Sequence, residues 1–359
     1  MIGAGIFTLV PLVIKYGNKN AVLAFIIGGI ACIFTGLSFA RLNYQYPVND
    51  AEYSWILEIL KNKKTNEPSK PVKAFAGITI WVVGVVGILT MALLSLGLFE
   101  FINTYNIGLS KRLIIFITLA VPTIINMIGV KSVANTATGL IIVVLVCFLF
   151  LIGAAGFKGK TKFLKQNTLV PNTSNMFNII RASFLTIFAF NGFQGVVQMS
   201  EETINKEIIP KSILASVSFT TVVYALLILS VISIIGLSKA SSTVYPISAA
   251  YSEILGTGGR NIVTTLSIIT MFSSLVIATL GVSRLFHKLS EKKIAPKYLS
   301  KLMPLDRIFS KEKFTNSNSG EEQNIVIKED NKKVSKFDRM PIPALLTLFV
   351  LAFAITFIK

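Results

Sequence analysis

Eight uncharged apolar stretches dominate this chain of 359 residues, and each is close to the length of a membrane-spanning helix. A helix needs about 20 apolar residues to cross the ~30 Å hydrocarbon core of a bilayer. Charged residues make up 14% of the chain, against roughly 25% in soluble domains. The sequence therefore predicts an all-α, polytopic membrane helix bundle that forms a single membrane domain over residues 1–359. The stretches are residues 21–40, 74–99, 113–130, 132–157, 182–200, 212–238, 261–283 and 342–358, and residues 1–14 form a partial ninth.

The net charge of +18 does not indicate a nucleic-acid partner, because the basic residues alternate with the apolar stretches. If residues 1–14 run outward, the cytoplasmic side carries 23 of the 35 Lys and Arg, in agreement with the positive-inside rule. However, 14 of the 23 lie between Arg284 and Arg339, and the basic loop around Lys158 lies on the other side. We expect a multi-pass protein of the cell membrane, with a disordered cytoplasmic insertion at residues 306–338. The cytoplasmic segments are then residues 41–73, 131, 201–211 and 284–341.

Residues suited to catalysis or metal binding are scarce. The single histidine, His287, lies among basic residues just past a predicted span, where we expect it to be solvated or to face lipid headgroups. One histidine and the separated cysteines Cys32 and Cys147 cannot form a metal site or a histidine-based triad. The carboxylates of Glu201 and Glu202 are adjacent, so on a helix they point in different directions. We expect no enzyme activity and no cofactor.

Glycine-containing runs interrupt two of the apolar stretches and predict broken helices. An unwound helix leaves backbone N–H and C=O groups without water in a bilayer, so such a break persists only where it faces protein or a cavity. Paired breaks in two halves of a chain point to a substrate site between inverted repeats. The half-helix beginning at Ile6 and Phe7 offers N–H groups to an anion, and the carbonyls near Phe188, Ala189 and Phe190 can accept from an ammonium group. The predicted substrate-binding residues are Gly3, Ala4, Gly5, Ile6, Phe188, Ala189, Phe190, Asn191, Gly192 and Gln194.

The side chains around the second break leave two interpretations open. Phe188, Phe190 and Phe193 could cover a bound ligand as a thin gate, or they could face lipid. Asn191 and Gln194 lie at membrane depth, where uncharged polar groups form hydrogen bonds inside a bundle, in a binding or a structural role.

Small residues elsewhere favour close helix packing. Gly28, Cys32, Gly36 and Ala40 recur every four residues, which places them on one face of a helix that another helix can approach. Trp81 lies among glycines in the next span, where packing is the default interpretation and a position on the substrate path is the alternative.

Several segments, in the right order along almost the whole chain, resemble the amino acid, polyamine and organocation (APC) permease superfamily. They are MIGAGIF at residues 1–7, FTGLSFARLNYQYPVNDAEYSW at 34–55, INMIGVKS at 125–132, FAFNGFQGVVQMSEETINKEIIPKSI at 188–213 and LGVSRLFHKLSEKKIAPKYL at 280–299. The resemblance implies a leucine-transporter-like fold of two inverted five-helix repeats, here residues 1–157 and an incomplete 178–359, with the first and sixth helices broken.

The resemblance also assigns roles to residues. It implies that Gly3 to Ile6 bind a substrate carboxylate through main-chain N–H groups and that Phe188 to Phe190 hold the amino group. It places Phe188 at a gating aromatic and Glu202 in a cytoplasmic gate network. The candidates for reading the substrate side chain are Ser273, Ser274 and Thr279, together with Trp81. Gln194 stands where many relatives carry an acid and Val144 where some carry a lysine, so coupling to H⁺ or Na⁺ stays open.

The sequence thus predicts a secondary transporter that moves an amino acid across the membrane by alternating access, with a cationic amino acid or a polyamine among the candidate substrates. Because the chain begins at the first break and stops after nine helices, we expect it to be incomplete at both ends. The alternative is a truncated, transport-inactive membrane protein or a regulatory partner of a full-length permease. The substrate, the oligomeric state and the role of the insertion stay open.

Overall fold

The computed structural model describes residues 2–158, 176–198, 200, 207–243, 245–304 and 339–358. The predicted insertion at residues 306–338 and the predicted gate residue Glu202 lie outside them. Within the described residues the chain is almost entirely helical, and the two-residue strands β1 (Met303–Pro304) and β2 (Arg339–Met340) pair antiparallel.

Every predicted span is helical, which confirms an all-α polytopic bundle. Seven helical segments of the described residues are long and apolar enough to cross a membrane, and α14, with 14 residues, is shorter. The span predicted at 182–200 is divided into α7 and the one-turn α8 (Gln194–Val197). The main helices are α1 (Ala4–Gly17), α2 (Ala21–Gln45), α4 (Lys70–Asn103), α5 (Lys111–Ile128), α6 (Val130–Lys158), α7 (Met176–Ala189), α9 (Ile208–Ile235), α12 (Gly258–Glu291) and α14 (Ile342–Ile355).

Short helices connect the spans. Prolines at the first turn of α4 and of α11 suit helix starts, because the missing N–H has no intrahelical acceptor there. The short helices are η1 (Asn18–Asn20), α3 (Ala51–Ile59), α10 (Leu237–Ser242), α11 (Pro246–Leu255) and η5 (Lys297–Ser300).

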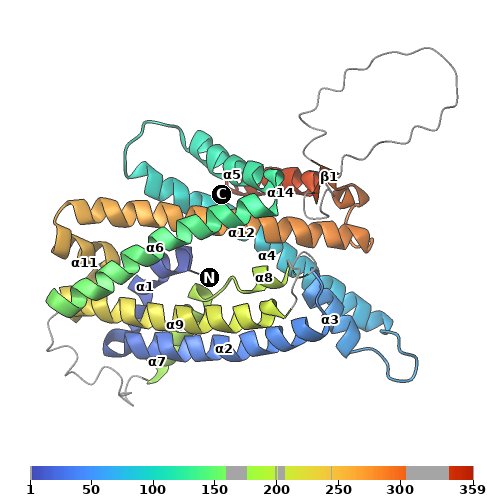
Figure 1. Cartoon of the computed structure of the whole chain (residues 1–359), viewed down its shortest axis with the longest axis horizontal. Coiled ribbons are helices and arrows are strands. Elements are labelled where there is room, and N and C mark those ends of the chain that lie inside the picture. The colour runs from blue at the N-terminus through green and yellow to red at the C-terminus, as the bar shows by residue number, and fades with distance from the viewer. Residues whose placement is uncertain are drawn as a thin grey trace, which may run out of the picture.

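The helices form two layers, each with its own large apolar core, and a small third cluster joins α12 to the beginnings of α6 and α14. Helices α1, α2, α7 and α9 share one core, whereas α4, α5 and α14 share the other with most of α12. In Figure 1 the blue α2 and the yellow-green α9 run side by side, the orange α12 crosses the molecule above them, and the short α1 lies between. Each layer therefore combines helices from the first and the second half of the chain.

The predicted small-residue face of α2 packs as expected. An added Cβ at Gly28 would overlap the Thr186 hydroxyl of α7, and one at Gly36 would lie 3.3 Å from Ile213 of α9. Cys32 and Ala40 are also buried. Their lack of bulk is therefore what lets α2 approach α7 and α9 closely.

Two expectations need correction. The first glycine run is less irregular than expected, because Ala4 and Gly5 already belong to α1 and only Gly3 is extended (φ −144°, ψ −159°).

His287 is not solvated: it is 8% exposed, with Nδ1 3.4 Å from the Leu299 carbonyl oxygen and Nε2 3.4 Å from Glu291. The segment after α12 folds back over the helix end and covers the ring, which the local charge pattern did not predict.

Candidate functional site

The two predicted breaks, far apart in sequence, meet in the folded chain. Helix α1 packs beside α7, and an added Cβ at Gly5 would lie 2.8 Å from the Cα of Ala189. A real Cβ essentially never comes this close to a backbone atom. Glycine is therefore required at position 5, and the first turn of α1 lies directly against the end of α7.

The second break leaves backbone acceptors available. Helix α7 ends at Ala189, Gly192 has a φ of 124° that favours glycine, and α8 begins at Gln194. The Asn191 N–H donates to the Phe188 carbonyl oxygen (3.2 Å), so the expectation that this carbonyl is freed is wrong. Within the described part of the chain, no backbone N–H donates to the carbonyls of Ala189 and Phe190.

The polar side chains of the break point back to its own backbone. The Gly192 N–H donates to Asn191 Oδ1 and to Gln194 Oε1, at 3.0 Å each. These amides therefore stabilise the unwound segment by replacing a helical acceptor that the break has removed. This contact supports the structural alternative for both residues and leaves their amide N–H groups for other partners.

The aromatic residues of the break are in different environments. Phe190 is fully buried, with its ring centroid 5.5 Å from that of Tyr224, and Phe193 packs edge-on against Phe39 at 5.4 Å. Phe188 is 64% exposed. Two of the rings thus hold the break in the core, while Phe188 alone is free to cover a ligand or contact lipid.

Tyr224 is a site residue that the sequence analysis did not single out. It is fully buried in α9, stacks edge-on against Phe25 at 6.0 Å, and its hydroxyl lies within hydrogen-bonding reach of the Gly3 backbone. Ile6, at the beginning of α1, is also fully buried. The signal in the sequence was a lone tyrosine in the apolar stretch 212–238, but nothing local placed it opposite Gly3.

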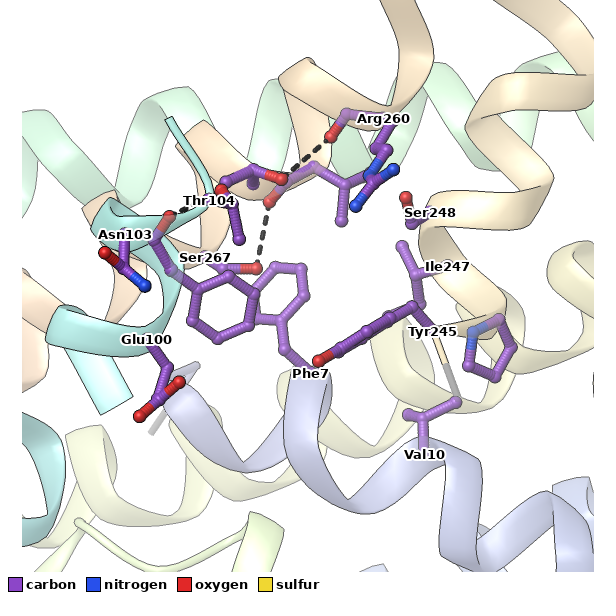
Figure 2. Close-up of a pocket in the computed structure, with 14 residues that line it drawn as sticks. Phe7, Val10, Glu100, Asn103, Thr104, Tyr245, Ile247, Ser248, Arg260 and Ser267 are labelled. Atoms are coloured by element: carbon purple, nitrogen blue, oxygen red, sulfur yellow. Dashed lines mark hydrogen bonds between the residues drawn. The ribbon is translucent and has the colours of Figure 1, made fainter. Parts of the chain in front are cut away.

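A cavity of about 270 Å³ lies on the far side of α1 from the break. Phe7 and Val10 of α1 form one wall, and the end of α4, the beginning of α11 and the first turns of α12 form the others. Figure 2 shows Glu100 and Arg260 on opposite sides of the cavity, with the Phe7 ring projecting between them and Ser267 behind. Charged groups of both signs beside aromatic rings suit a small zwitterion. The sequence analysis did not predict this cavity, because its walls come from four separate segments.

The remaining predicted side chains form their hydrogen bonds and ring contacts with residues outside the break. Ser274 and Thr279 donate to the carbonyls of Thr270 and Leu275 in their own helix, and Ser273 is buried in α12. Trp81 packs against Phe286 (5.8 Å) and lines a groove on the outer side of α4. None of the four lines the cavity beside α1.

A polar cluster joins α3 to the end of α12. Asp50 is fully buried, and its Oδ2 accepts from Lys292 Nζ (2.5 Å) and from the Ser54 hydroxyl (2.9 Å). The ammonium also lies 5.2 Å from the Tyr53 ring centroid. Burial raises the pKa of the neighbouring Glu52 carboxyl, the hydrogen bond from the Glu52 backbone partly opposes this, and the negative charge of Asp50 adds a smaller upward effect.

Comparison with known proteins agrees with this architecture. A family profile described as amino acid permease matches residues 1–358. The inner membrane transport protein YbaT of Escherichia coli is 24% identical, with 84% of this chain and 68% of the relative covered. The branched-chain amino acid permease BcaP of Bacillus subtilis is 23% identical (85% and 67% covered), and the serine/threonine exchanger SteT of the same species is 26% identical (82% and 66% covered).

The chain spans about two thirds of the length of these relatives. The profile, by contrast, covers almost every residue of the chain. Together with the apolar helices, this establishes that the protein belongs to the amino acid permease family of multi-pass membrane transporters and is not an enzyme.

Proposed function

We propose that the protein binds an amino acid where the start of α1 meets the break between α7 and α8, and carries it across the membrane by alternating access. The close approach of Gly5 to Ala189 is the observation that supports this most directly. It brings the N-terminal N–H groups of α1 next to a segment with available carbonyls. A carboxylate and an ammonium on one carbon atom need such a pair of partners close together.

The carboxylate is assigned to α1. A helix N-terminus presents N–H groups that point outward along the helix axis, together with the positive end of the helix dipole. The first turn of α1 holds no acidic residue, and Gly3 provides no side-chain cap. When the substrate binds, the Tyr224 hydroxyl beside Gly3 either moves aside for the carboxylate or forms a further hydrogen bond to the carboxylate.

The amino group is assigned to the carbonyls of Ala189 and Phe190, which end α7. The negative end of that helix dipole favours a cation there. Phe188, exposed beside them, is the side chain placed to close over the ligand.

The two layers provide the moving parts. We assign α1, α2, α7 and α9 to one body and α4, α5, α12 and α14 to the other, each drawn from both predicted repeats. Rocking of one body against the other is a known route to alternating access. The cavity beside α1 is bounded by helices of both layers, so this movement would open or close it as the external approach to the site.

A neutral amino acid is the substrate we propose to test first. The described residues of the two breaks contribute no acidic side chain to balance a cationic side chain. The printed names of two relatives refer to branched-chain amino acids and to serine and threonine. Val144 is buried and apolar, so this position cannot supply the positive charge that a lysine would supply there. We propose that a bound ion or a proton supplies this charge during transport.

Uptake by the purified chain in liposomes tests the proposal. A panel of radiolabelled neutral, cationic and acidic amino acids is offered with an imposed proton gradient, with a sodium gradient and with neither. We expect saturable uptake of a neutral amino acid that an excess of the unlabelled compound blocks. Absence of uptake across the panel, in vesicles where the chain is folded and inserted, would refute transport by this chain and favour the alternative of a transport-inactive or regulatory protein.

A further inference from the structure

An apolar groove follows the outer face of α4 at the end where this helix begins. It measures about 680 Å³, is open to the surroundings, and has almost no polar surface. No atom lies within 4 Å of a Cβ added at Gly77, so the floor of the groove is empty at that point. The groove residues are Ala74, Gly77, Ile78, Trp81, Val82, Val85 and Val86 of α4, with Ile294 from the segment after α12.

Basic side chains gather at one end of this groove. Lys70 and Lys73 precede Gly77 by seven and four residues, so they continue the same helix face two turns and one turn earlier, respectively. Lys293 directly precedes Ile294, the groove residue on the opposite wall. All three lysines are exposed, and none of them forms an ion pair with the residues that the structure describes. Lys292 does not belong to this set, because Asp50 and Ser54 hold it.

We propose that this surface binds one anionic phospholipid, with an acyl chain in the groove and the phosphate between Lys70, Lys73 and Lys293. The groove is apolar where the hydrocarbon would lie and positively charged where the headgroup would lie, and α4 carries no acidic residue before Glu100. Basic pockets on the cytoplasmic side of membrane helices bind anionic headgroups in this way. Trp81 lies one helical turn beyond Gly77, on the path that the acyl chain would follow along the groove.

The bound lipid would add a contact between two segments that also pack within the same apolar core. Its headgroup would contact both the start of α4 and the segment after α12, and its chain would lie between Ile294 and the α4 face. The site is independent of the substrate site, because none of its residues lines the cavity or the breaks.

Native mass spectrometry of the full chain, released from nanodiscs of equal phosphatidylglycerol and phosphatidylcholine, tests this site. The wild type is expected to retain one phosphatidylglycerol in preference to phosphatidylcholine. The triple variant Lys70→Gln, Lys73→Gln, Lys293→Gln is expected to lose this preference by at least tenfold, since each lysine near an anionic lipid surface contributes about fivefold. The matched control is Lys15→Gln, Lys19→Gln, Lys111→Gln, which removes equal charge elsewhere and is expected to keep the preference.

A second variant tests the apolar half of the site. Gly77→Leu fills open space, so it should fold normally while reducing phosphatidylglycerol retention, and soluble glycerol phosphate should not compete with the lipid. Equal retention of both lipids by the wild type would overturn the proposal. Loss of the preference in the control variant, unchanged retention in the triple variant, or a second copy of the chain in place of the lipid would overturn it as well.

Discussion

Gly5→Ala is the substitution that tests the contact between the two breaks most directly. The new methyl carbon would lie 2.8 Å from the Cα of Ala189, whereas ordinary contacts begin at 3.4 Å. The obstacle is backbone, so no side-chain rotation relieves it, and α1 must move away from α7. Overpacking of this kind costs about 1–3 kcal/mol of stability. Because a misplacement of about 1 Å can cost about 100-fold in rate at a reacting site, we expect uptake to fall at least tenfold.

The assay is initial-rate uptake of the labelled substrate in proteoliposomes, with equal amounts of inserted protein verified for each variant. Gly153→Ala is the matched control, because it adds the same methyl group to a membrane helix at a place where nothing lies within 4 Å. It should transport like the wild type. Gly5→Val should abolish uptake and still insert. If Gly5→Ala keeps the wild-type maximal rate and half-saturation concentration, the two breaks do not form the substrate site together.

Three further predictions concern the polar groups. Burial and Asp50 raise the pKa of Glu52, so the folded state binds the Glu52 proton more tightly than the unfolded state does. Thermal stability should therefore fall as the pH rises above the ordinary glutamate pKa of about 4.3. Glu52→Gln should remove this pH dependence, and an unchanged pH profile in the variant would contradict the prediction. Lys292→Gln should lower the free energy of unfolding by about 1–3 kcal/mol because it leaves the Asp50 carboxylate buried without its cation, and adding Asp50→Asn should restore part of the loss in a thermal unfolding assay. Gln194→Leu should cost about 0.5–1.5 kcal/mol and weaken substrate binding, because it removes one acceptor of the Gly192 N–H; equal binding by the variant would show that this hydrogen bond does not shape the site.

The spans and the second break were predictable from sequence because the bilayer restricts the possibilities so strongly. A backbone in hydrocarbon must satisfy its own hydrogen bonds, so long uncharged stretches become helices, and a glycine between polar amides marks where one of them unwinds. The structure accordingly ends α7 at Ala189 and begins α8 at Gln194. The first break was harder to place, because Ala4 and Gly5 can extend a helix as readily as interrupt one.

The residues that sequence analysis missed depend on neighbours distant in the chain. Tyr224 faces Gly3 only because α2 packs against both α9 and α1, and Glu100 and Arg260 share a cavity only because α4 packs beside α12. His287 is buried because a later segment covers it. Local charge and hydropathy carry no information about such partners.

Composition and the length of the uncharged apolar stretches by themselves determined that this is a helical membrane protein, where its helices run, and that one of them unwinds around Gly192. These properties follow because a backbone group left unpaired in lipid costs free energy, and each segment has to satisfy its own backbone hydrogen bonds. Only the tertiary structure decided that Gly5 lies against Ala189, which carbonyls stay available, and which charged groups share a cavity. Those properties depend on how closely two helices approach, and side chains from separate segments set that distance.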